Sequence, residues 1–489
     1  MLFRSILATA EKKSLHRTLG AFQLTMLGVG AVIGTGIFVL TAEAAQKAGP
    51  GMMLSFVIAG FVCAVAALCY AEMAAMVPVS GSAYTYSYAV MGELVAWMVG
   101  WALILEYAIA AGAVSVGWSG YMIGFVQNTF HVTVPLEFVR GPFDGGLINL
   151  PAMSIAAVIT GLLVLGTKES ATVNAVLVAI KIVALTAFVV VAVPAVKSSN
   201  FVPFVPNGWG SPFGGVGVLG AAASIFFAYV GFDAVSTAAE ETKNPNRNIP
   251  IGLIGSLVIC TIFYLLVSYG AVGSVGAQPM LGPNGASLQP GTPAMAAACV
   301  GSQALVCSKD ALAHVMVLLG HNTMGSLIGL AAALALPSVI LMMIYGQSRI
   351  FFTMSRDGLL PNFLSTVHPR FHTPHILTII TGVFVSLFAA LFPVGILADI
   401  TNSGTLFAFI MVAIGVMVLR VKQPQRPRPF RTPLVWVICP LAVLGCLLLF
   451  FNLSGYTLTL FFSWAAIGLV VYYLYGYRKS HLANGTEPS

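Results

Sequence analysis

Hydrophobic residues dominate the chain in long runs separated by short polar segments. A helix needs about 20 apolar residues to cross a ~30 Å hydrocarbon core, because each residue rises ~1.5 Å. Three segments, 125–149, 197–215 and 275–311, are too polar or too irregular to cross and are predicted to be loops. The remaining pattern predicts an all-α integral membrane protein with twelve transmembrane helices, near 20–46, 51–77, 92–124, 150–167, 171–196, 216–241, 250–274, 325–347, 375–393, 396–420, 434–453 and 455–477.

The composition supports a membrane protein and excludes a soluble one. Of the 489 residues, 58% are hydrophobic and 8% are charged, whereas about a quarter of the residues in a soluble domain are charged. The formal net charge of +7 does not require a nucleic-acid partner, because the positions of the charges follow the membrane topology. We therefore expect membrane lipids, and no nucleic acid, around this chain.

The positive charges are distributed unequally between the two sides of the membrane. Twelve spans place both termini on one side, and 17 of the 22 Lys and Arg residues then fall on that side. Only Lys47, Arg140, Lys197 and Lys309 fall on the other side, and Lys181 lies inside a span. Positive charge is retained in cytoplasmic loops, so both termini are predicted to be cytoplasmic in a multi-pass protein of the inner cell membrane.

The two ends of the chain carry no span of their own. Residues 1–19 are basic and lack the apolar stretch and small-residue cleavage site of a signal peptide. We expect 1–19 to be a cytoplasmic leader and 478–489 to be a cytoplasmic tail.

Two cysteines fall in the predicted outer loop 275–311. Cys299 and Cys307 are eight residues apart, and an external loop permits disulfide formation. The pair is a disulfide candidate, and two unpaired thiols are the alternative.

Charged residues inside the spans are candidates for function, because each costs about 2.5–3.5 kcal/mol at the membrane centre. Lys181 lies about ten residues from each end of the fifth span, so its side chain is too short to reach the headgroups. Glu106, midway through the third span, is the expected partner at the same depth. The pair is predicted to exchange a proton, and a static buried ion pair is the alternative.

Three further carboxylates lie within the spans. Asp233 follows a glycine in the sixth span, which suggests an interrupted helix lined by water; hydrogen bonding to neighbouring helices is the alternative. Glu72, near the cytoplasmic end of the second span, is expected to be structural. Asp399 precedes Thr401, Asn402 and Ser403 and is expected to begin the tenth helix as its cap.

Glycines predict two helix breaks. The first span contains four glycines between Gly28 and Gly36, each weakening a helix by about 1 kcal/mol relative to alanine. If the helix unwinds at Gly34–Gly36, free amides and a half-helix N-terminus can bind a carboxylate. The sixth span has a weak point at Ala228–Gly231, and it runs in the opposite direction. Paired breaks in two inverted halves indicate a transporter site, over which Phe227 is a candidate gate.

Longer motifs give a family resemblance. The chain resembles the amino acid–polyamine–organocation transporters, and within them the bacterial relatives of the cationic amino acid transporter branch. The similarity covers roughly residues 15–475. It rests on Gly30-Ala31-Val32-Ile33-Gly34-Thr35-Gly36-Ile37-Phe38, Tyr70-Ala71-Glu72, Val77-Pro78 to Tyr84, Phe227-Ala228-Tyr229-Val230-Gly231-Phe232-Asp233 with Glu240-Glu241 and Asn244-Pro245, Met354 to Pro361, Gly404 to Ala408, and Phe430-Arg431-Thr432-Pro433.

The resemblance implies a LeuT-like fold. Two inverted five-helix repeats would occupy 20–196 and 216–420, with helices 1 and 6 broken, and two C-terminal helices would occupy 434–477. A bacterial member with twelve spans would lack the extra spans of vertebrate relatives.

The resemblance also implies roles for single residues. In proton-coupled relatives a lysine of the fifth helix takes the place of a sodium ion; Lys181 matches it, and Glu106 matches an acid of the third helix. The gate falls at Phe227. The substrate carboxylate would be bound by Ile33, Gly34, Thr35 and Gly36, and the substrate amine by Phe227, Ala228 and Val230.

Substrate preference would be read from the eighth helix, here Leu327–Tyr345. Leu330, Leu334 and Leu336, with the small residues Ala331–Ala333, offer no acidic partner for a cationic side chain. This favours neutral substrates, although Glu106 or Asp233 leaves a cationic substrate open.

The chain is thus expected to be a secondary active transporter of small neutral or broad-range L-amino acids, coupled to protons. Cationic amino acid uptake and exchange of amino acids or polyamines without proton coupling are the alternatives. An ion channel is more remote, since no filter motif or ring of like charges appears. We expect no enzyme activity, cofactor or metal, because His368, His372 and His375 in a Pro-interrupted loop are the only metal-like pattern. The oligomeric state and a small accessory membrane subunit stay open.

Overall fold

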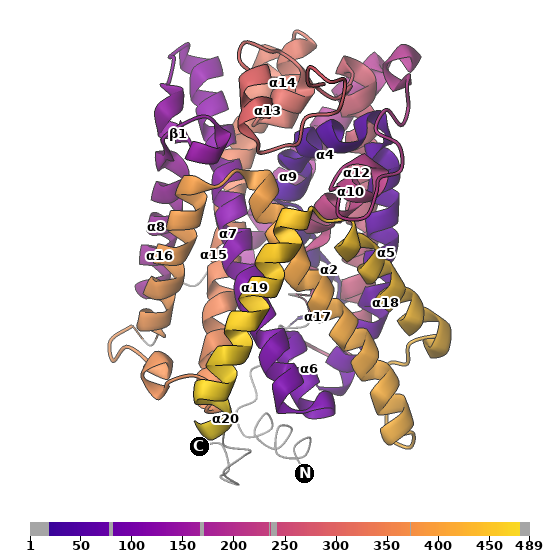
Figure 1. The fold of residues 1–489 in the computed structure, drawn as a ribbon, viewed down its shortest axis with the longest axis vertical. Coiled ribbons are helices and arrows are strands. Elements are labelled where there is room, and N and C mark those ends of the chain that lie inside the picture. Colours follow the sequence, from indigo (N-terminus) through magenta and orange to yellow (C-terminus); the bar gives the residue numbers. More distant parts are fainter. Residues whose placement is uncertain are drawn as a thin grey trace.

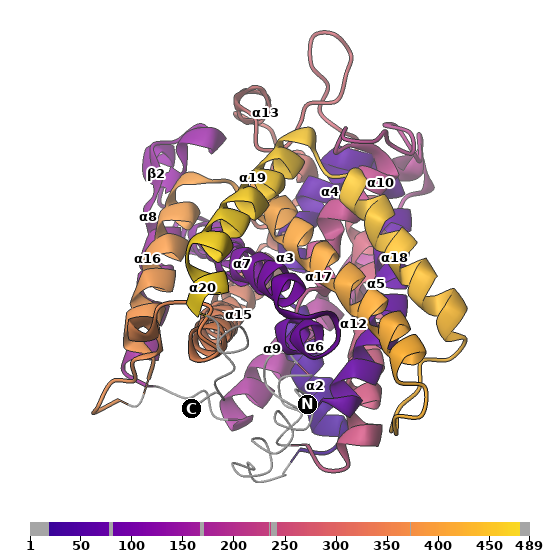
Figure 2. The same ribbon diagram turned by 60° about the horizontal axis from the view of Figure 1, so that its bottom comes forward.

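The protein is a bundle of helices in its computed structural model, which describes residues 19–77, 82–166, 171–233, 235, 242–371 and 373–479. Helix α7 runs through the centre of the bundle, packed against α15 and α17 (Figures 1 and 2). Apart from Leu19, the predicted leader lies outside the described residues, as do the tail beyond residue 479 and most of 234–241.

Apolar helices coincide with each predicted span. Among the described residues, seven stretches of helix are long and apolar enough to cross a membrane, judged by length and composition, and five shorter apolar helices accompany them. The long stretches are formed by α4 (Leu40–Ala48) with α5 (Met52–Met76), α7 (Glu93–Phe130), α9 (Ala171–Ala192), α12 (Pro245–Val275), α15 (Asn322–Arg356), α17 (Val394–Lys422) and α19 (Gly455–Val471). The shorter ones are α2 (Ala21–Val32), α8 (Leu150–Val164), α10 (Gly217–Ile225), α16 (His375–Leu391) and α18 (Val435–Phe451).

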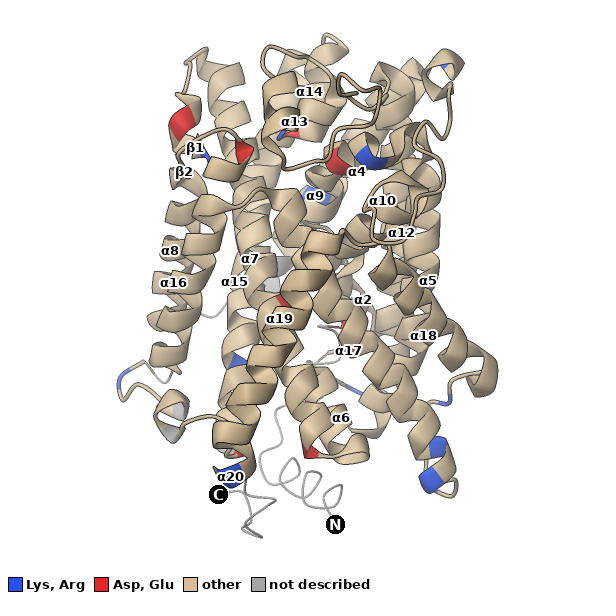
Figure 3. Ribbon diagram, viewed as in Figure 1, with Lys and Arg blue, Asp and Glu red and all other residues tan. Residues whose placement is uncertain are grey.

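The predicted loops lie at the ends of the bundle and contain short elements. At the upper end in Figure 1 are the hairpin of β1 (Val139–Arg140) and β2 (Ile148–Asn149), α13 (Pro293–Ala298) and α14 (Ala311–Leu318); α6 (Ser82–Met91) and α20 (Tyr477–Lys479) are at the lower end. Helix α7 continues six residues beyond its predicted end, to Phe130. Lys and Arg mark the lower ends of α17 and α20, an acidic residue lies at the lower end beside α6, and both signs of charge also occur at the upper end (Figure 3).

Two helices are interrupted at the glycine positions that the sequence indicates. Helix α2 ends at Val32, the backbone turns at Gly34 (φ −148°, ψ −146°), and α3 (Thr35–Phe38) begins directly afterwards. Helix α10 is followed by the 3-10 helix η6 (Phe226–Tyr229). Gly231 then adopts φ +110°, a backbone conformation that L side chains rarely adopt.

The two interruptions pack against each other through their backbones. A Cβ atom added to Gly36 would lie 2.2 Å from the Cα atom of Ala228, and one added to Gly231 would lie 3.0 Å from the Ala31 carbonyl oxygen. Only glycine allows an approach this close. The broken segments therefore form one joint at the middle of the bundle.

A buried ion pair links three helices toward the upper end of the bundle in Figure 1. The Lys47 ammonium of α4 lies 3.0 Å from the Asp399 carboxylate of α17, and the Ser224 hydroxyl of α10 hydrogen-bonds with both side chains. Asp399 is 6% exposed and lies inside α17, which begins at Val394. The predicted role of Asp399 as a helix cap is therefore wrong, because α17 has its N-cap at Pro393, six residues before Asp399. The sequence placed Lys47 on the outer side but did not predict this pairing.

A second charged cluster links α5 and α17 at the other end. The Glu72 carboxylate, fully buried, accepts hydrogen bonds from the Arg420 guanidinium (2.9 and 2.7 Å) and from the Thr432 amide (2.8 Å). The Arg428 guanidinium lies 3.2 Å from the same carboxylate. Glu72 thus holds the segment after α17 against α5, which is a structural role.

The close approach of the two breaks generates a first prediction. Gly36→Ala should lower the melting temperature, because the added methyl group meets the backbone of Ala228 rather than a flexible side chain. Gly161→Ala in α8 is the matched control, since nothing lies within 4 Å of its Cβ position; there alanine should stabilise by up to about 1 kcal/mol. Thermal unfolding of the purified variants measures this. Equal behaviour of both variants would contradict the packing.

The Lys47–Asp399 ion pair generates a second prediction. Lys47→Met should destabilise the protein by about 3–5 kcal/mol, because it leaves the Asp399 carboxylate buried without its cation. The double variant Lys47→Met/Asp399→Leu should regain most of that loss. Lys309→Met is the control, because the ion pair of Lys309 with Asp144 is more exposed and is expected to contribute about 0–1 kcal/mol. Melting temperatures measure all three, and a Lys47→Met shift no larger than that of the control would refute the prediction.

Candidate functional site

Backbone carbonyls released by the breaks are bound by two side chains. Because α2 ends at Val32, the carbonyls of its last turn have no amide of the same helix to accept from. The Lys181 ammonium of α9 donates to the Gly30 carbonyl at 2.8 Å. The Tyr264 hydroxyl of α12 lies 2.9 Å from the Val32 carbonyl oxygen and 2.7 Å from that of Ala228. Tyr264 therefore contacts both broken segments. The sequence analysis did not predict this role, and the one signal for it is a polar hydroxyl in the middle of an apolar span.

The predicted ion pair between Lys181 and Glu106 is wrong. The ion pairs formed among described residues do not include it, and one oxygen of the Glu106 carboxylate is buried without a hydrogen-bond partner there. Helix α15 packs against both α7 and α9, the helices that carry the two residues. The lysine instead donates to the Gly30 carbonyl, which the helix break leaves without an amide of its own helix. The prediction compared only the depths of charged side chains and therefore did not include backbone acceptors.

Glu106 lies in a different polar cluster. It interacts electrostatically with Asp233 and hydrogen-bonds with Thr405 of α17. The Tyr107 hydroxyl donates to the Asp233 carboxylate at 3.1 Å, and Gly346 of α15 allows the Tyr107 ring to pack against its backbone. Both carboxylates are 2% exposed. The two carboxylates repel each other when both are charged.

The predicted carboxylate-binding residues lie together at the first break. Ile33, Gly34, Thr35 and Gly36 are all buried. The amides of Thr35 and Gly36 open a new helix and therefore have no acceptor within it. The Thr35 hydroxyl is buried and has no hydrogen-bond partner in the described part of the chain. Free amides and a free hydroxyl at one point are suited to bind an anion.

The predicted amine-binding residues lie at the second break. The Phe227 carbonyl accepts the Val230 amide at 3.1 Å, and the Ala228 carbonyl contacts Tyr264. A carbonyl oxygen has two lone pairs, so each can accept a further hydrogen bond from an ammonium group. The side chain of the candidate gate, Phe227, is buried beside them.

The face of helix α15 that lies beside this site is not the predicted one. Leu330 and Leu334 are 36% and 53% exposed on the outside of the bundle, so their predicted contact with a substrate is wrong. Leu336 is buried. The methyl groups of Val339 lie 3.5 and 3.7 Å from the position of a Cβ atom at Gly34, so Val339 is the α15 side chain beside the first break. An apolar helix that is hydrophobic all round does not indicate which face is inward.

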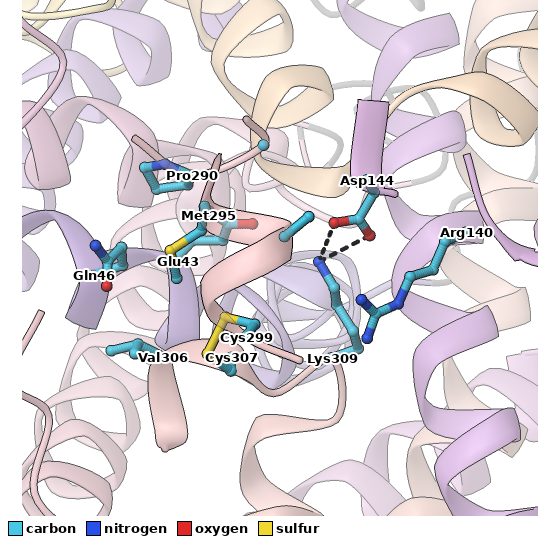
Figure 4. A pocket seen from close by; sticks show the side chains of 12 residues that line it. Glu43, Gln46, Arg140, Asp144, Pro290, Met295, Cys299, Val306, Cys307 and Lys309 are labelled. Atoms are coloured by element: carbon cyan, nitrogen blue, oxygen red, sulfur yellow. Dashed lines mark hydrogen bonds and ion pairs between the residues drawn. A yellow bond between two sulfur atoms is a disulfide. The ribbon is translucent and has the colours of Figure 1, made fainter. Parts of the chain in front are cut away.

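The upper end of the bundle in Figure 1 carries a disulfide and a pocket. Cys299 and Cys307 are joined by a disulfide with their Cα atoms 5.3 Å apart, and both line a pocket between α4, α13 and the β1–β2 hairpin (Figure 4). No group of three metal-ligating side chains occurs in the described residues. Of the three histidines considered earlier, His372 lies outside them, and His368 accepts two backbone amides of its own turn.

Comparison with known proteins agrees with this architecture. The family model described as "Amino acid permease" matches residues 19–474. The chain is 46% identical over 480 residues to the branched-chain amino acid permease BcaP of Bacillus subtilis, covering 98% of this chain and 97% of that protein. It is 41% identical over 479 residues to the methylthioribose transporter of the same organism, with the same coverage. It is 37% identical to the vacuolar cationic amino acid transporter 4 of Arabidopsis thaliana, covering 84% of this chain and 64% of the plant protein. The chain is therefore a membrane transporter that belongs to the amino acid permease family.

Proposed function

We propose that the protein is a proton-coupled symporter of neutral L-amino acids, branched-chain amino acids included, and that it works by alternating access. It would lie in the cell membrane with both termini in the cytoplasm. Residues 20–196 and 216–420 would form two inverted repeats in a LeuT-like arrangement, with 434–477 as two additional helices. The observation that carries the proposal is the joint between the two helix breaks, where backbone polar groups from both halves meet.

The joint has the chemistry to bind the common part of every α-amino acid. The substrate carboxylate would accept hydrogen bonds from the Thr35 and Gly36 amides and from the Thr35 hydroxyl. The substrate ammonium would donate to carbonyls between Phe227 and Val230. Phe227 would cover the bound substrate, and the buried Lys47–Asp399 pair would hold the outer side closed.

The apolar wall beside the joint favours a neutral side chain. Helix α15 contains no acidic residue, and Val339 is its side chain beside Gly34. The most similar relatives named above include a branched-chain amino acid permease, which supports aliphatic substrates. The relatives named for cationic amino acids and methylthioribose make those compounds the competitors to include in any substrate panel.

Proton coupling would act through Lys181 and the carboxylate cluster. The ammonium of Lys181 fixes the end of α2 through the Gly30 carbonyl, so the loss of its proton would weaken that contact and release the inner half of the first helix. Glu106 and Asp233, on α7 and just after the second break, would hold the transported proton between them. Both groups touch segments that must move when the site opens inward.

The coupling proposal predicts the behaviour of Lys181→Ala in proteoliposomes. Uptake of labelled L-leucine driven by an inward proton gradient should fall at least about tenfold (about 1.4 kcal/mol), whereas exchange against preloaded leucine should be less affected. Lys197→Ala, in an outer loop, is the matched control and should resemble the wild type. Undiminished dependence on the pH gradient in Lys181→Ala would refute the coupling. Wild-type uptake that requires preloading would make the protein an exchanger.

The side-chain wall predicts a change in selectivity. Val339→Phe should reduce the transport of leucine relative to alanine by about 10–200-fold, because a few carbon atoms in an apolar pocket change selectivity by about 1–3 kcal/mol. Leu334→Phe, on the outward face of the same helix, should leave the ratio unchanged. Competition of unlabelled amino acids for uptake measures the ratio. Equal ratios in the two variants would show that Val339 does not contact the substrate.

A further inference from the structure

Positive charge is concentrated where α17 ends and the linker to α18, residues 423–434, begins. Lys and Arg mark this lower end of α17 in Figure 3. The cations are Arg420, Lys422, Arg426, Arg428 and Arg431. No Asp or Glu occurs in the sequence between residues 401 and 486, so neither the linker nor the two helix ends beside it supply a negative charge. The counter-charge must therefore come from another part of the chain or from outside the protein.

Among the described residues, one carboxylate forms the ion pairs of this cluster of cations, and it is shared. The Glu72 carboxylate of α5 lies 2.7 Å from the Arg420 guanidinium and 3.2 Å from that of Arg428. Burial first, and then the like charges of Arg420 and Arg431, lower the pKa of Arg428. Lys422 and Arg431 have no ion-pair partner in the part of the chain that the structure describes. The single shared carboxylate therefore leaves a surplus of positive charge.

The linker has a defined shape because it folds around the Arg428 side chain, which is 2% exposed. The Arg428 guanidinium donates, over 2.8–3.1 Å, to the backbone carbonyls of Leu419, Gln423, Pro424 and Arg426. The Thr432 amide donates to Glu72 at 2.8 Å, and the Thr432 hydroxyl donates to the Leu68 carbonyl of α5 at 3.0 Å. Lys422 and Arg431, on either side of this fold, are both exposed. They therefore present their charges at the surface from fixed backbone positions.

Exposed apolar side chains flank these two cations. Val421 is 69% exposed, Leu434 is 77% exposed and Trp436 is 60% exposed. Tryptophan beside Lys and Arg at the end of a transmembrane helix is typical of the boundary between lipid headgroups and hydrocarbon. The linker is therefore suited to lie at the surface of the bilayer, with its cations among the headgroups.

We propose that the α17–α18 linker binds the headgroup of an anionic phospholipid, with Lys422 and Arg431 contacting its phosphate. A guanidinium can donate two parallel hydrogen bonds to a phosphate, and basic residues next to a membrane helix attract anionic lipids. The acyl chains would cover Leu434 and Trp436. An acidic protein segment would leave these apolar side chains in water, and a zwitterionic phospholipid has no net charge to offset the surplus. The site does not depend on which substrate the protein transports.

A lipid bound here would act on the contact between α5 and α17. Arg420 and Arg428 share the carboxylate of Glu72, and Arg431 adds to the repulsion at Arg428. A phosphate beside Arg431 would offset that repulsion without competing for Glu72. The headgroup would thereby strengthen the attachment of the linker to α5.

The test uses the fluorescence of Trp436 in the full-length protein, reconstituted in phosphatidylcholine vesicles that contain brominated phosphatidylglycerol or brominated phosphatidylcholine. Bromine quenches tryptophan at contact, and subtracting the signal of Trp436→Phe isolates this one side chain. We expect brominated phosphatidylglycerol to bind beside Trp436 at least about fivefold more strongly than brominated phosphatidylcholine, since one cation near the membrane surface contributes about this factor. Lys422→Gln/Arg431→Gln should lose the preference, and each single variant should lose part of it. Arg370→Gln, in the loop before α16, removes the same charge elsewhere and should retain it.

Each other outcome would overturn the proposal. Equal quenching by the two brominated lipids in the wild type would show that no anionic lipid is selected. A preference that persists in Lys422→Gln/Arg431→Gln would place the lipid elsewhere, and an equal loss in Arg370→Gln would show a general attraction to the charged surface. Millimolar inorganic phosphate at constant ionic strength should leave the quenching unchanged, and a decrease would show that soluble phosphate is the ligand. Because both side chains are exposed, the single variants remain informative if the double variant fails to fold.

Discussion

The organisation of the protein follows from the need to satisfy backbone polar groups where no water is available. Inside a membrane an unpaired amide or carbonyl costs several kcal/mol, so an interrupted helix persists only where other groups replace the lost hydrogen bonds. Here Lys181 and Tyr264 bind the carbonyls at the end of α2, and Tyr264 also contacts the second break. These contacts satisfy the free carbonyls at the two interruptions, but they leave other polar groups there without partners in the described part of the chain. The amides that open α3 have no acceptor within that helix, and the Thr35 hydroxyl has no partner among the described residues, which is why we propose the joint as the binding site.

Buried charged side chains at the two ends of the bundle also need partners, and they find them on neighbouring helices. The Lys47–Asp399 pair and the Glu72 cluster each join α17 to helices of the first half of the chain, one on each side of the joint. A buried ion pair contributes little net stability over an apolar contact, because desolvation offsets the attraction. When water enters, the separated charges are solvated again. Such an ion pair can therefore hold two helices together while the contact excludes water. Once water reaches the charges, the helices can separate at a modest cost in free energy.

The sequence allows the elements to be predicted much better than their partners. Run length located the helices, and the glycines of the first span together with the Ala228–Gly231 weak point located both breaks. The side chains that complete the site could not be assigned in this way. Leu334 and Val339 look alike in an apolar helix, and only the neighbouring helices decide which one faces Gly34. Lys181 donates to the Gly30 carbonyl rather than to Glu106. This acceptor is free because helix α2 ends at Val32, and a list of side chains does not include it. Asp399 was misread because the polar residues after it resemble a helix start.

Glu43 and Lys47 lie on the same short helix, but only Lys47 has an ion-pair partner among the described residues. Both lie on α4, yet Lys47 is buried against its carboxylate partner while Glu43, one turn away, has no cation in contact among the described residues. If the protein needed only rigidity at this end, an uncharged residue at position 43 would avoid the desolvation cost.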